Sequence, residues 1–312
     1  MSVEKQLLIC GAGPAGLSAA IYAGRFGLDT VVLEEKVSGG QAAMAANVEN
    51  YPGFTSIRGM ELMDVMRKQA EQSGSEIRDL VPVKKIEREG EKFKIVSQTD
   101  TYIVDAVIIA TGREHTKLGV PGEERLTGRG VSYCATCDGP LFKGKRVLVV
   151  GGGNTACSEA LYLSEIAGKV HMAHRRDDLR AEAYYKRVLQ DREVHIHWNT
   201  EVKEIEGDKI VKRIRLFNNK TGEEILLDVD AVFIAVGYEP MSEIAREAGV
   251  EVDNEGYIIV DREQKTNVEG IFAAGDVTGG GVFQIAKAVG EGTTAAINAY
   301  LYIRGGWYAT KE

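Results

Sequence analysis

Two cysteines, Cys134 and Cys137, stand three positions apart in the segment SYCATCDGP, residues 132–140. This spacing occurs in zinc knuckles, in structural disulfides and in thiol pairs that open and close during a reaction. A redox pair needs a thiolate as its attacking species and a nearby group that moves protons. Asp138 directly follows Cys137 and is suited to that second task. The pair alone leaves the three alternatives open.

The remaining cysteines help to separate these alternatives. A structural zinc site takes four ligands, whereas Cys10 and Cys157 each adjoin a glycine-rich turn and are expected to be small buried residues. A purely structural disulfide is disfavoured in a reducing compartment. We therefore favour a redox-active dithiol and expect no metal site.

A glycine-rich turn near the start of the sequence predicts a nucleotide site. The apolar segment QLLIC (6–10) is followed by GAGPAG (11–16), by a helix of small residues and by the strand TVVLEE (30–35). Gly11, Gly13 and Gly16 fit the G-x-G-x-x-G pattern, which allows a tight turn and the close approach of a pyrophosphate to a helix N-terminus. Glu34 stands 23 positions after Gly11 (34 − 11), where an acid reaches ribose hydroxyls.

The same plan occurs a second time. The strand KRVLVV (145–150) precedes GGGNTA (151–156), a helix and the strand KVHMAHRR (169–176). Twenty-three positions after Gly151 (151 + 23 = 174), the sequence has HRRDDLR (174–180) in place of an acid. Arginine side chains bind a 2′-phosphate through bidentate charge-assisted bonds. This site is predicted to prefer NADP(H) over NAD(H), with a solvated basic surface as the alternative.

Near copies of one further segment support a duplicated α/β architecture. DAVIIATG (105–112) and DAVFIAVG (230–237) each predict an apolar strand that ends in glycine. A third such strand, GIFAAG, leads into Asp276, and residues 285–303 predict a long helix rich in small residues. Ligands bind open α/β sheets at the carboxyl ends of parallel strands. Asp276 is therefore a candidate ligand-binding residue, or alternatively a helix cap.

Composition limits the class of protein. The length of 312 residues corresponds to about two domains, and 44% hydrophobic with 27% charged residues is ordinary for a globular chain. A net charge of −8 without a long basic run argues against nucleic-acid binding. The sequence has neither a secretory layout at its amino terminus nor a stretch of about 18 apolar residues. We expect a cytoplasmic protein.

Taken in order, GAGPAG, GGQ, ENYPGF, ATG, CATCDG, VVGGGN, HRR and GIFAAGDV resemble the prokaryotic low-molecular-weight thioredoxin reductases, over about residues 5 to 303. The resemblance implies two Rossmann-like, three-layer α/β domains. An FAD domain would comprise residues 1–114 and 245–312, and an inserted NADPH domain residues 115–244. It further implies a homodimer and a thioredoxin or thioredoxin-like protein as partner.

The resemblance also assigns residues. Cys137 would face the flavin and form the charge-transfer thiolate, Cys134 would attack the protein substrate, and Asp138 would be the acid–base group. The implied FAD contacts are Gly11, Gly13, Pro14, Ala15, Gly16, Glu34, Gly39, Gly40, Gln41, Asn50, Thr111, Gly112, Gly275, Asp276, Gln284 and Ile285. The implied NADPH contacts are Gly151, Gly153, Asn154, Thr155, Ala156, His174, Arg175, Arg176, Arg180 and Gly237.

Two positions depart from the family pattern. Phe283 stands where the family often has arginine, immediately before Gln284, and Met241 stands where it often has asparagine. The first departure is expected to change the electrostatics near the flavin. Two other functions remain open: a related reductase with another electron donor or with a glutaredoxin-like or peroxiredoxin-linked acceptor, and a flavin-binding redox sensor without turnover.

Overall fold

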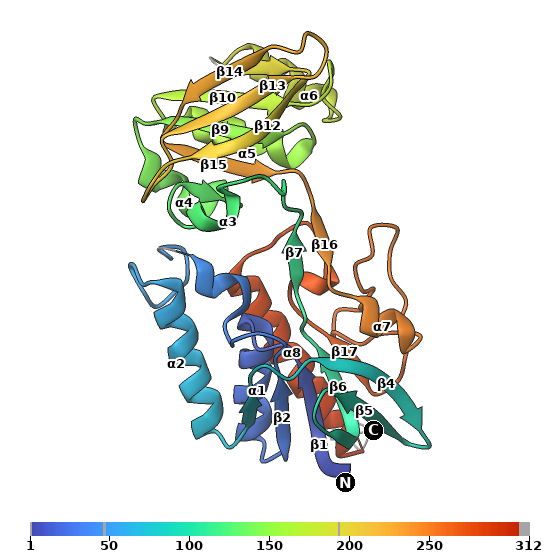
Figure 1. Cartoon of the computed structure of the whole chain (residues 1–312). Helices are drawn as coiled ribbons and strands as arrows, with labels where there is room; N and C mark the ends of the chain where they lie inside the picture. Colours follow the sequence, from blue (N-terminus) through green and yellow to red (C-terminus); the bar gives the residue numbers. More distant parts are fainter. Residues whose placement is uncertain (1, 46–47, 193, 306–312) are drawn as a thin grey trace. The chain divides into compact units, whose positions relative to one another are not determined.

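The computed structural model describes residues 2–45, 48–192 and 194–305. The chain forms two compact units, the first from residues 1–114 and 239–312 and the second from residues 115–238 (Figure 1). Residues 239–244, which the sequence analysis assigned to the inserted domain, belong to the first unit. Where the chain passes between the units, two short strands pair with each other, β7 (Arg113–His115) and β16 (Tyr238–Pro240).

A seven-stranded sheet, as far as the chain is described, organises the first unit in the order β3-β2-β1-β6-β5-β4, with β17 also paired to β6. Where the parallel strands are buried on both faces, at residues 7–10, 30–33 and 106–109, they are continuous and largely apolar runs, whereas residues 76–78 at the edge of the sheet are half-buried. They are β1 (Ser2–Cys10), β2 (Thr30–Leu33), β3 (Glu76–Arg78), β6 (Thr101–Ile109) and β17 (Ile271–Ala273). An antiparallel hairpin, β4 (Val83–Glu89) and β5 (Lys92–Ser97), completes the sheet.

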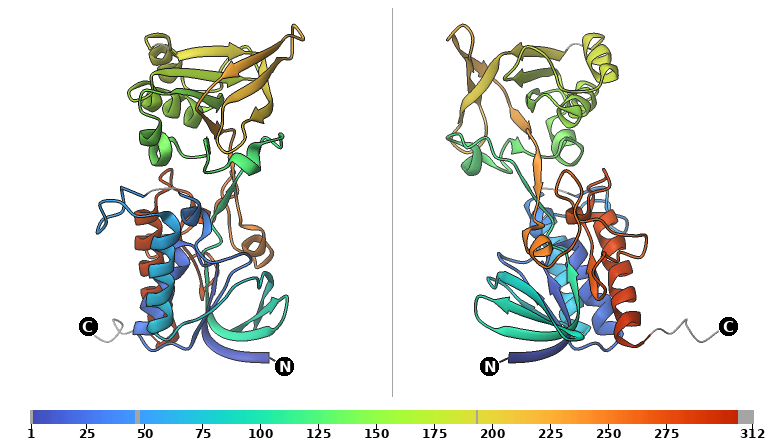
Figure 2. Two further views of the ribbon diagram at one scale, coloured as in Figure 1. Left: turned by 60° about the vertical axis from the view of Figure 1, so that its left-hand side comes forward. Right: turned by 90° about the vertical axis from the view of Figure 1, so that its right-hand side faces the viewer.

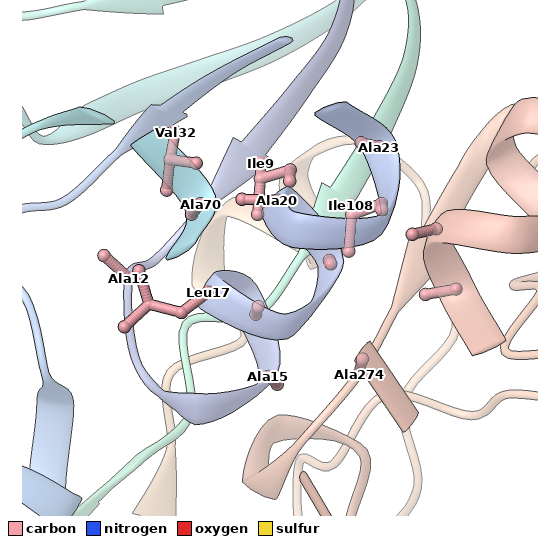
Figure 3. Close-up of a cluster of buried hydrophobic side chains, with 14 of the residues drawn as sticks. Ile9, Ala12, Ala15, Leu17, Ala20, Ala23, Val32, Ala70, Ile108 and Ala274 are labelled. Carbon is pink, nitrogen blue, oxygen red and sulfur yellow. The ribbon is translucent and has the colours of Figure 1, made fainter. Parts of the chain in front are cut away.

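Three helices lie together on one side of this sheet (Figures 1 and 2). They are α1 (Pro14–Arg25), α2 (Gly59–Gln72) and α8 (Ile285–Ile303). Small residues let α1 and α8 approach closely, because a Cβ on Gly292 would lie 2.0 Å from the Ala15 carbonyl oxygen. Figure 3 shows Leu17 and Ala20 of α1 packed with Ile9 and Ile108 of the sheet. The shorter helices of this unit are η1 (Gly40–Met44), α7 (Glu243–Glu247) and η3 (Asp276–Thr278).

The second unit is built on a parallel sheet in the order β11-β10-β9-β15-β8. Its strands are β8 (Val131–Ser132), β9 (Arg146–Gly151), β10 (Lys169–His174), β11 (Val194–Trp198) and β15 (Ala231–Ala235). Alternate residues of β9 enter two different cores, Val147 and Val149 on one face and Leu148 and Val150 on the other. Both faces of the sheet are therefore covered.

Different layers cover these two faces (Figure 2). Helices α5 (Asn154–Ser164) and α6 (Ala183–Gln190) cover one face. The antiparallel strands β12 (Thr200–Glu206), β13 (Arg213–Asn218) and β14 (Glu224–Asp228) cover the other. Three single turns complete the unit: α3 (Glu123–Leu126), α4 (Ala135–Asp138) and η2 (Gly139–Phe142).

The predicted α/β fold with two parallel sheets is confirmed. The long helix expected at residues 285–303 coincides with α8. None of the helices in the described ranges has the length and apolar character that a membrane crossing requires.

Candidate redox and nucleotide sites

A disulfide joins Cys134 and Cys137, whose Cα atoms are 5.3 Å apart. Cys134 precedes the single turn α4, and the Asp138 N–H donates to the Cys134 carbonyl at 3.1 Å. Cys10 and Cys157 are buried, as predicted. Burial raises the pKa of Cys10 to about 12 and that of Cys157 to about 11, so both thiols are inert at neutral pH. In the described ranges, no group of three or more His, Cys, Asp or Glu residues could hold a metal ion.

The carboxyl group of Asp138 is enclosed next to this disulfide. Burial raises the pKa of Asp138, and a hydrogen bond from the Ser132 hydroxyl opposes that shift. Ser132 Oγ lies 2.7 Å from Asp138 Oδ2, whereas Oδ1 has no hydrogen-bond partner within the described residues. A carboxyl group with a raised pKa exchanges protons closer to neutral pH, as the acid–base role requires.

Several residues that the sequence analysis did not single out surround the pair. Glu159 of α5 accepts a weak hydrogen bond from the Ala135 N–H at 3.4 Å. Tyr133 donates to Glu123 Oε1 at 2.8 Å, and its ring stacks on that of His115 at 4.3 Å. The only signal for these residues in the sequence is that Tyr133 directly precedes Cys134. Glu123, His115 and Glu159 come together with the segment of the pair only in the folded structure.

The first glycine turn forms a cradle with the GGQ segment. Gly11 has φ of +103°, and a Cβ there would lie 2.4 Å from the Ala110 carbonyl oxygen. A Cβ on Gly16 would lie 1.8 Å from the Gly11 carbonyl oxygen. Gly13 instead faces open space, with only Gly40 Cα at 3.9 Å. Two of the three glycines thus serve packing, and the third leaves room for a phosphate at the start of α1.

The N-terminal end of α1 suits an anion. Pro14 is at the first helical position, and no side chain caps the helix. Glu34 accepts hydrogen bonds from two backbone N–H groups, at 2.7 Å from Ala12 and 2.8 Å from Lys36. The predicted ribose-binding acid therefore also fixes the turn. The N–H groups at the start of the helix fit the pyrophosphate of a dinucleotide.

Other predicted FAD residues meet within the first unit. Asn50 donates to Gln284 Oε1 at 3.0 Å. Gln41 donates to the Arg113 carbonyl at 2.7 Å. The strand-end residues are likewise engaged, since Thr111 donates to the Met241 carbonyl at 2.6 Å. These bonds bring together four segments that are far apart in the sequence.

Gly275 and Asp276 lie just after the carboxyl end of β17, which is a parallel strand of the sheet. Burial raises the pKa of Asp276, against the opposing effects of Arg113 and Lys287. Arg113 Nε lies 3.4 Å from Asp276 Oδ2. The Gly275 N–H donates to Glu291 Oε2 at 2.9 Å, and Ile285 begins α8 nearby in the sequence. Arg113 was not among the predicted cofactor contacts, because its role depends on this tertiary contact.

The second glycine turn repeats the division of labour. A Cβ on Gly151 would lie 2.3 Å from the Ala235 carbonyl oxygen and 2.7 Å from the Ala156 Cβ, whereas Gly153 faces open space. Asn154 and Glu182 hold each other through two hydrogen bonds of 2.9 Å. Thr155 lies in the first turn of α5, and the carbonyl of Gly237 accepts from the Thr116 N–H at 3.0 Å.

His174 supports the turn from beneath. It is buried, and a Cβ on Gly152 would lie 2.2 Å from its ring. Its Nε2 donates to the Asp178 carbonyl at 3.1 Å. Burial lowers the pKa of His174, which keeps the ring neutral at pH 7. The side chain thus orients the loop that follows.

The arginines of that loop are exposed. Asp177 pairs with Lys220 at 2.6 Å, and Asp178 pairs with Lys186 at 2.8 Å. Within the described residues, no salt bridge engages the guanidinium groups of Arg175, Arg176 or Arg180. The backbone N–H of Arg180 donates to the Gly152 carbonyl at 2.7 Å, which holds the loop beside the glycine turn. Lysines neutralise the two acids of the loop, while its three arginines are left for an anionic ligand.

Comparisons with known proteins agree with this geometry. The family model for pyridine nucleotide-disulphide oxidoreductases matches residues 5–292. The chain is 47% identical to the thioredoxin reductase of Listeria monocytogenes, over 95% of this chain and 93% of that protein. It is 44% identical to that of Bacillus subtilis, over 97% and 96%. The crystal structure of thioredoxin reductase from Streptococcus pyogenes is similar, with a TM-score of 0.92, 40% identity and coverage of 98% and 100%.

Proposed function

Because this chain belongs to the pyridine nucleotide-disulphide oxidoreductases and is an oxidoreductase of the thioredoxin reductase kind, we propose that it carries electrons from NADPH through FAD and the Cys134–Cys137 pair to a thioredoxin-like protein. The observation that carries this proposal is the disulfide itself, beside a carboxyl group of raised pKa, in the unit that also has the second glycine turn.

The first unit, residues 1–114 and 239–312, is the proposed FAD domain. The open space over Gly13 and the uncapped start of α1 fit a pyrophosphate. Glu34, Asn50, Asp276 and Gln284 offer oxygen and amide groups to the remaining polar atoms of the cofactor. FAD, when bound, accepts a hydride equivalent from a nicotinamide and passes two electrons to a disulfide.

The second unit, residues 115–238, is the proposed NADPH domain. Gly153 leaves room for the pyrophosphate at the start of α5, as Gly13 does for FAD. Arg175, Arg176 and Arg180 would bind the 2′-phosphate, for which three exposed guanidinium groups without salt bridges in the described chain are suited. NADH has no 2′-phosphate and would gain nothing from this charge.

The cysteines then carry out a two-electron exchange. Two electrons break the Cys134–Cys137 S–S bond; the Cys137 sulfur remains a thiolate, and the Cys134 sulfur takes the proton of Asp138. In the following exchange, Cys134 returns this proton to Asp138 as its sulfur attacks the substrate disulfide, which forms a mixed disulfide and releases one substrate thiolate. The Cys137 thiolate then attacks the Cys134 sulfur, which restores the Cys134–Cys137 disulfide and releases the second substrate thiolate. The two substrate thiolates take protons from solvent, so the substrate leaves as a dithiol.

The identity of the acceptor, the oligomeric state and the compartment are further parts of the proposal. We take the acceptor to be a thioredoxin or thioredoxin-like protein, the assembly to be a homodimer, and the location to be the cytoplasm, where a reducing environment keeps such cysteines available. Light scattering of the purified protein tests the dimer.

A coupled assay tests the proposed function. NADPH oxidation is followed with thioredoxin, a glutaredoxin and a peroxiredoxin as separate acceptors, and each is repeated with NADH. We expect turnover with NADPH and thioredoxin. If NADPH is oxidised only with the glutaredoxin or the peroxiredoxin, that protein is the acceptor instead of thioredoxin. If no combination of donor and acceptor gives turnover, the proposed function is wrong.

A further inference from the structure

Ser132 occupies the centre of the hydrogen bonds around the redox pair. It is the last residue of β8 and is buried. Its hydroxyl oxygen lies 2.7 Å from Asp138 Oδ2 and 3.1 Å from the Cys134 backbone N. The Cys134 carbonyl oxygen is also within 3.3 Å. One hydroxyl group thus contacts both the acid–base residue and the backbone of the attacking cysteine.

The number of hydrogens restricts these contacts. A serine hydroxyl donates one hydrogen bond and accepts up to two. The Cys134 N–H donates to Ser132 Oγ, so the single hydroxyl hydrogen goes either to Asp138 Oδ2 or to the Cys134 carbonyl. The distance of 2.7 Å against 3.3 Å favours the carboxyl group. A carboxylate accepts such a bond more strongly than a neutral carboxylic acid does.

We propose that Ser132 is a positioning residue that stabilises the ionised form of Asp138 through Oδ2, and that Oδ1 is therefore the oxygen that carries the transferable proton. This inference rests on the proposed function, because it divides the proton transfer between the two oxygens of one carboxyl group. It also explains why Oδ1 is enclosed without a hydrogen-bond partner in the described chain.

The proton balance of the step is simple. When the S–S bond has opened, the O–H bond at Asp138 Oδ1 breaks and an S–H bond forms at a cysteine sulfur anion. The negative charge moves from sulfur to the carboxylate. Ser132 keeps its own hydrogen throughout and directs it at Oδ2, where it lowers the free energy of the new charge. In the reverse direction, the same bond must weaken as Asp138 regains its proton.

Few other charged groups face this carboxyl group. Helix α5 packs against α4 and contributes Cys157, Glu159 and Tyr162 as titratable residues. The strand beside β8 is β15, with the sequence AVFIA, and η2 has the sequence GPLF, so neither contributes a titratable side chain. Burial and the Ser132 bond are the two causes that act on the pKa of Asp138.

The test is a direct titration of Asp138. Protein labelled with ¹³C at aspartate carboxyl carbons is titrated by NMR in the disulfide form, and Asp138→Asn identifies the resonance. In Ser132→Ala, we expect the Asp138 midpoint to rise by about one to two pH units, because a hydrogen bond to a charged group is lost. Ser132→Thr keeps the hydroxyl and should retain the wild-type midpoint. Ser164→Ala is the matched control, since its hydroxyl donates to the Leu161 carbonyl of the same helix.

The pH profile of thioredoxin reduction provides a second readout. The profile of Ser132→Ala should move in the same direction as the NMR midpoint, and in an Asp138→Asn background the serine change should have no further effect on the profile. An unchanged midpoint in Ser132→Ala, or a loss of rate that is equal at every pH and adds fully to that of Asp138→Asn, would overturn the inference.

Two provisions keep the test decisive. If Ser132→Ala does not fold, Ser132→Cys replaces it, because a thiol is a weaker donor and should raise the midpoint by about half as much. An unchanged midpoint in that variant would also overturn the inference. The titration requires no turnover, so a failure of the proposed function and a failure of the Ser132 assignment remain distinguishable.

Discussion

The guanidinium carbon of Arg113 lies 3.3 Å from the centre of the Phe283 ring, and Nε of the same side chain lies 3.4 Å from Asp276 Oδ2. Phe283 stands where thioredoxin reductases often have arginine, so the sequence of this chain alone implies that a positive charge is missing at this place. The stacked Arg113 returns a cation to this place. Its side chain is only 11% exposed, which strengthens both the stacking and the ion pair.

Arg113→Ala should weaken FAD binding by about tenfold, because a partly desolvated cation–π contact and an ion pair to Asp276 are lost together. Titration of the apoprotein with FAD, followed by flavin fluorescence, measures the dissociation constant. Arg88→Ala removes another arginine stacked on a ring, that of Phe93, and serves as the control with unchanged affinity. Equal FAD affinity in Arg113→Ala and wild type would refute this role.

Arg175→Ala combined with Arg176→Ala should abolish the preference for NADPH. The 2′-phosphate loses two charge-assisted partners, so KM for NADPH should rise by about 100-fold while KM for NADH changes little. The ratio of kcat/KM for the two donors is the measurement. Arg192→Ala, whose residue pairs with Glu165 on the same unit, should leave that ratio unchanged. A double variant that still prefers NADPH would show that the phosphate binds elsewhere.

Gly153→Ala separates folding from nucleotide binding. A Cβ there meets no atom within 4 Å, so the melting temperature should fall by only a few degrees. The affinity for NADPH should nevertheless drop by about tenfold or more, because the methyl group takes the place of the pyrophosphate. Gly151→Ala should instead fail to fold normally, since its Cβ would lie 2.3 Å from the Ala235 carbonyl oxygen. Calorimetry of both variants provides the comparison, and normal NADPH binding by Gly153→Ala would contradict it.

Acid should destabilise the second unit through two histidines of β10 and β11. Burial and neighbouring charged groups lower the pKa of His171 and of His197 to about 4, and their ring nitrogens are 3.0 Å apart. The unfolded chain, with a histidine pKa near 6.5, binds more protons between about pH 6.5 and 4. The free energy of unfolding should therefore fall as the pH drops through this window, by on the order of 2 kcal/mol after allowance for solvent screening.

Denaturant unfolding at pH 7.5 and pH 4.5 measures this loss. His171→Gln should reduce this loss of stability, because it removes one of the two imidazole rings whose pKa is lowered in the folded protein. His195 lies on the same strand as His197 and is exposed, and its charge contributes to the lowered pKa of both rings, so His195→Gln should reduce the pH dependence by less than His171→Gln does. An equal loss of stability in His171→Gln and wild type would assign the acid sensitivity to other groups.

The sequence predicted what depends on local pattern. The duplicated strand–turn–helix plan and the helix at 285–303 follow from residue periodicity and glycine spacing, and the structure confirms them. It did not predict Ser132, Glu159 or Arg113. The roles of Glu159 and Arg113 arise from contacts with distant segments, whereas Ser132 bonds Asp138 within the same turn, where only the folded backbone shows which side chains meet. His174 illustrates the limit, since the structure buries its ring under Gly152, a contact that no local pattern predicts.

The central claim is that NADPH reduces the Cys134–Cys137 disulfide and that a thioredoxin-like protein reoxidises it. Alkylation followed by mass spectrometry tests it directly, with the native FAD-loaded protein treated anaerobically with NADPH and then with oxidised thioredoxin. Cys10 and Cys157 are buried and should remain unmodified throughout. In samples alkylated after NADPH, we predict that both cysteines of the pair are modified. In samples alkylated after the later addition of thioredoxin, we predict that the pair is again a disulfide and is protected. A pair that stays disulfide-bonded after NADPH would contradict the account.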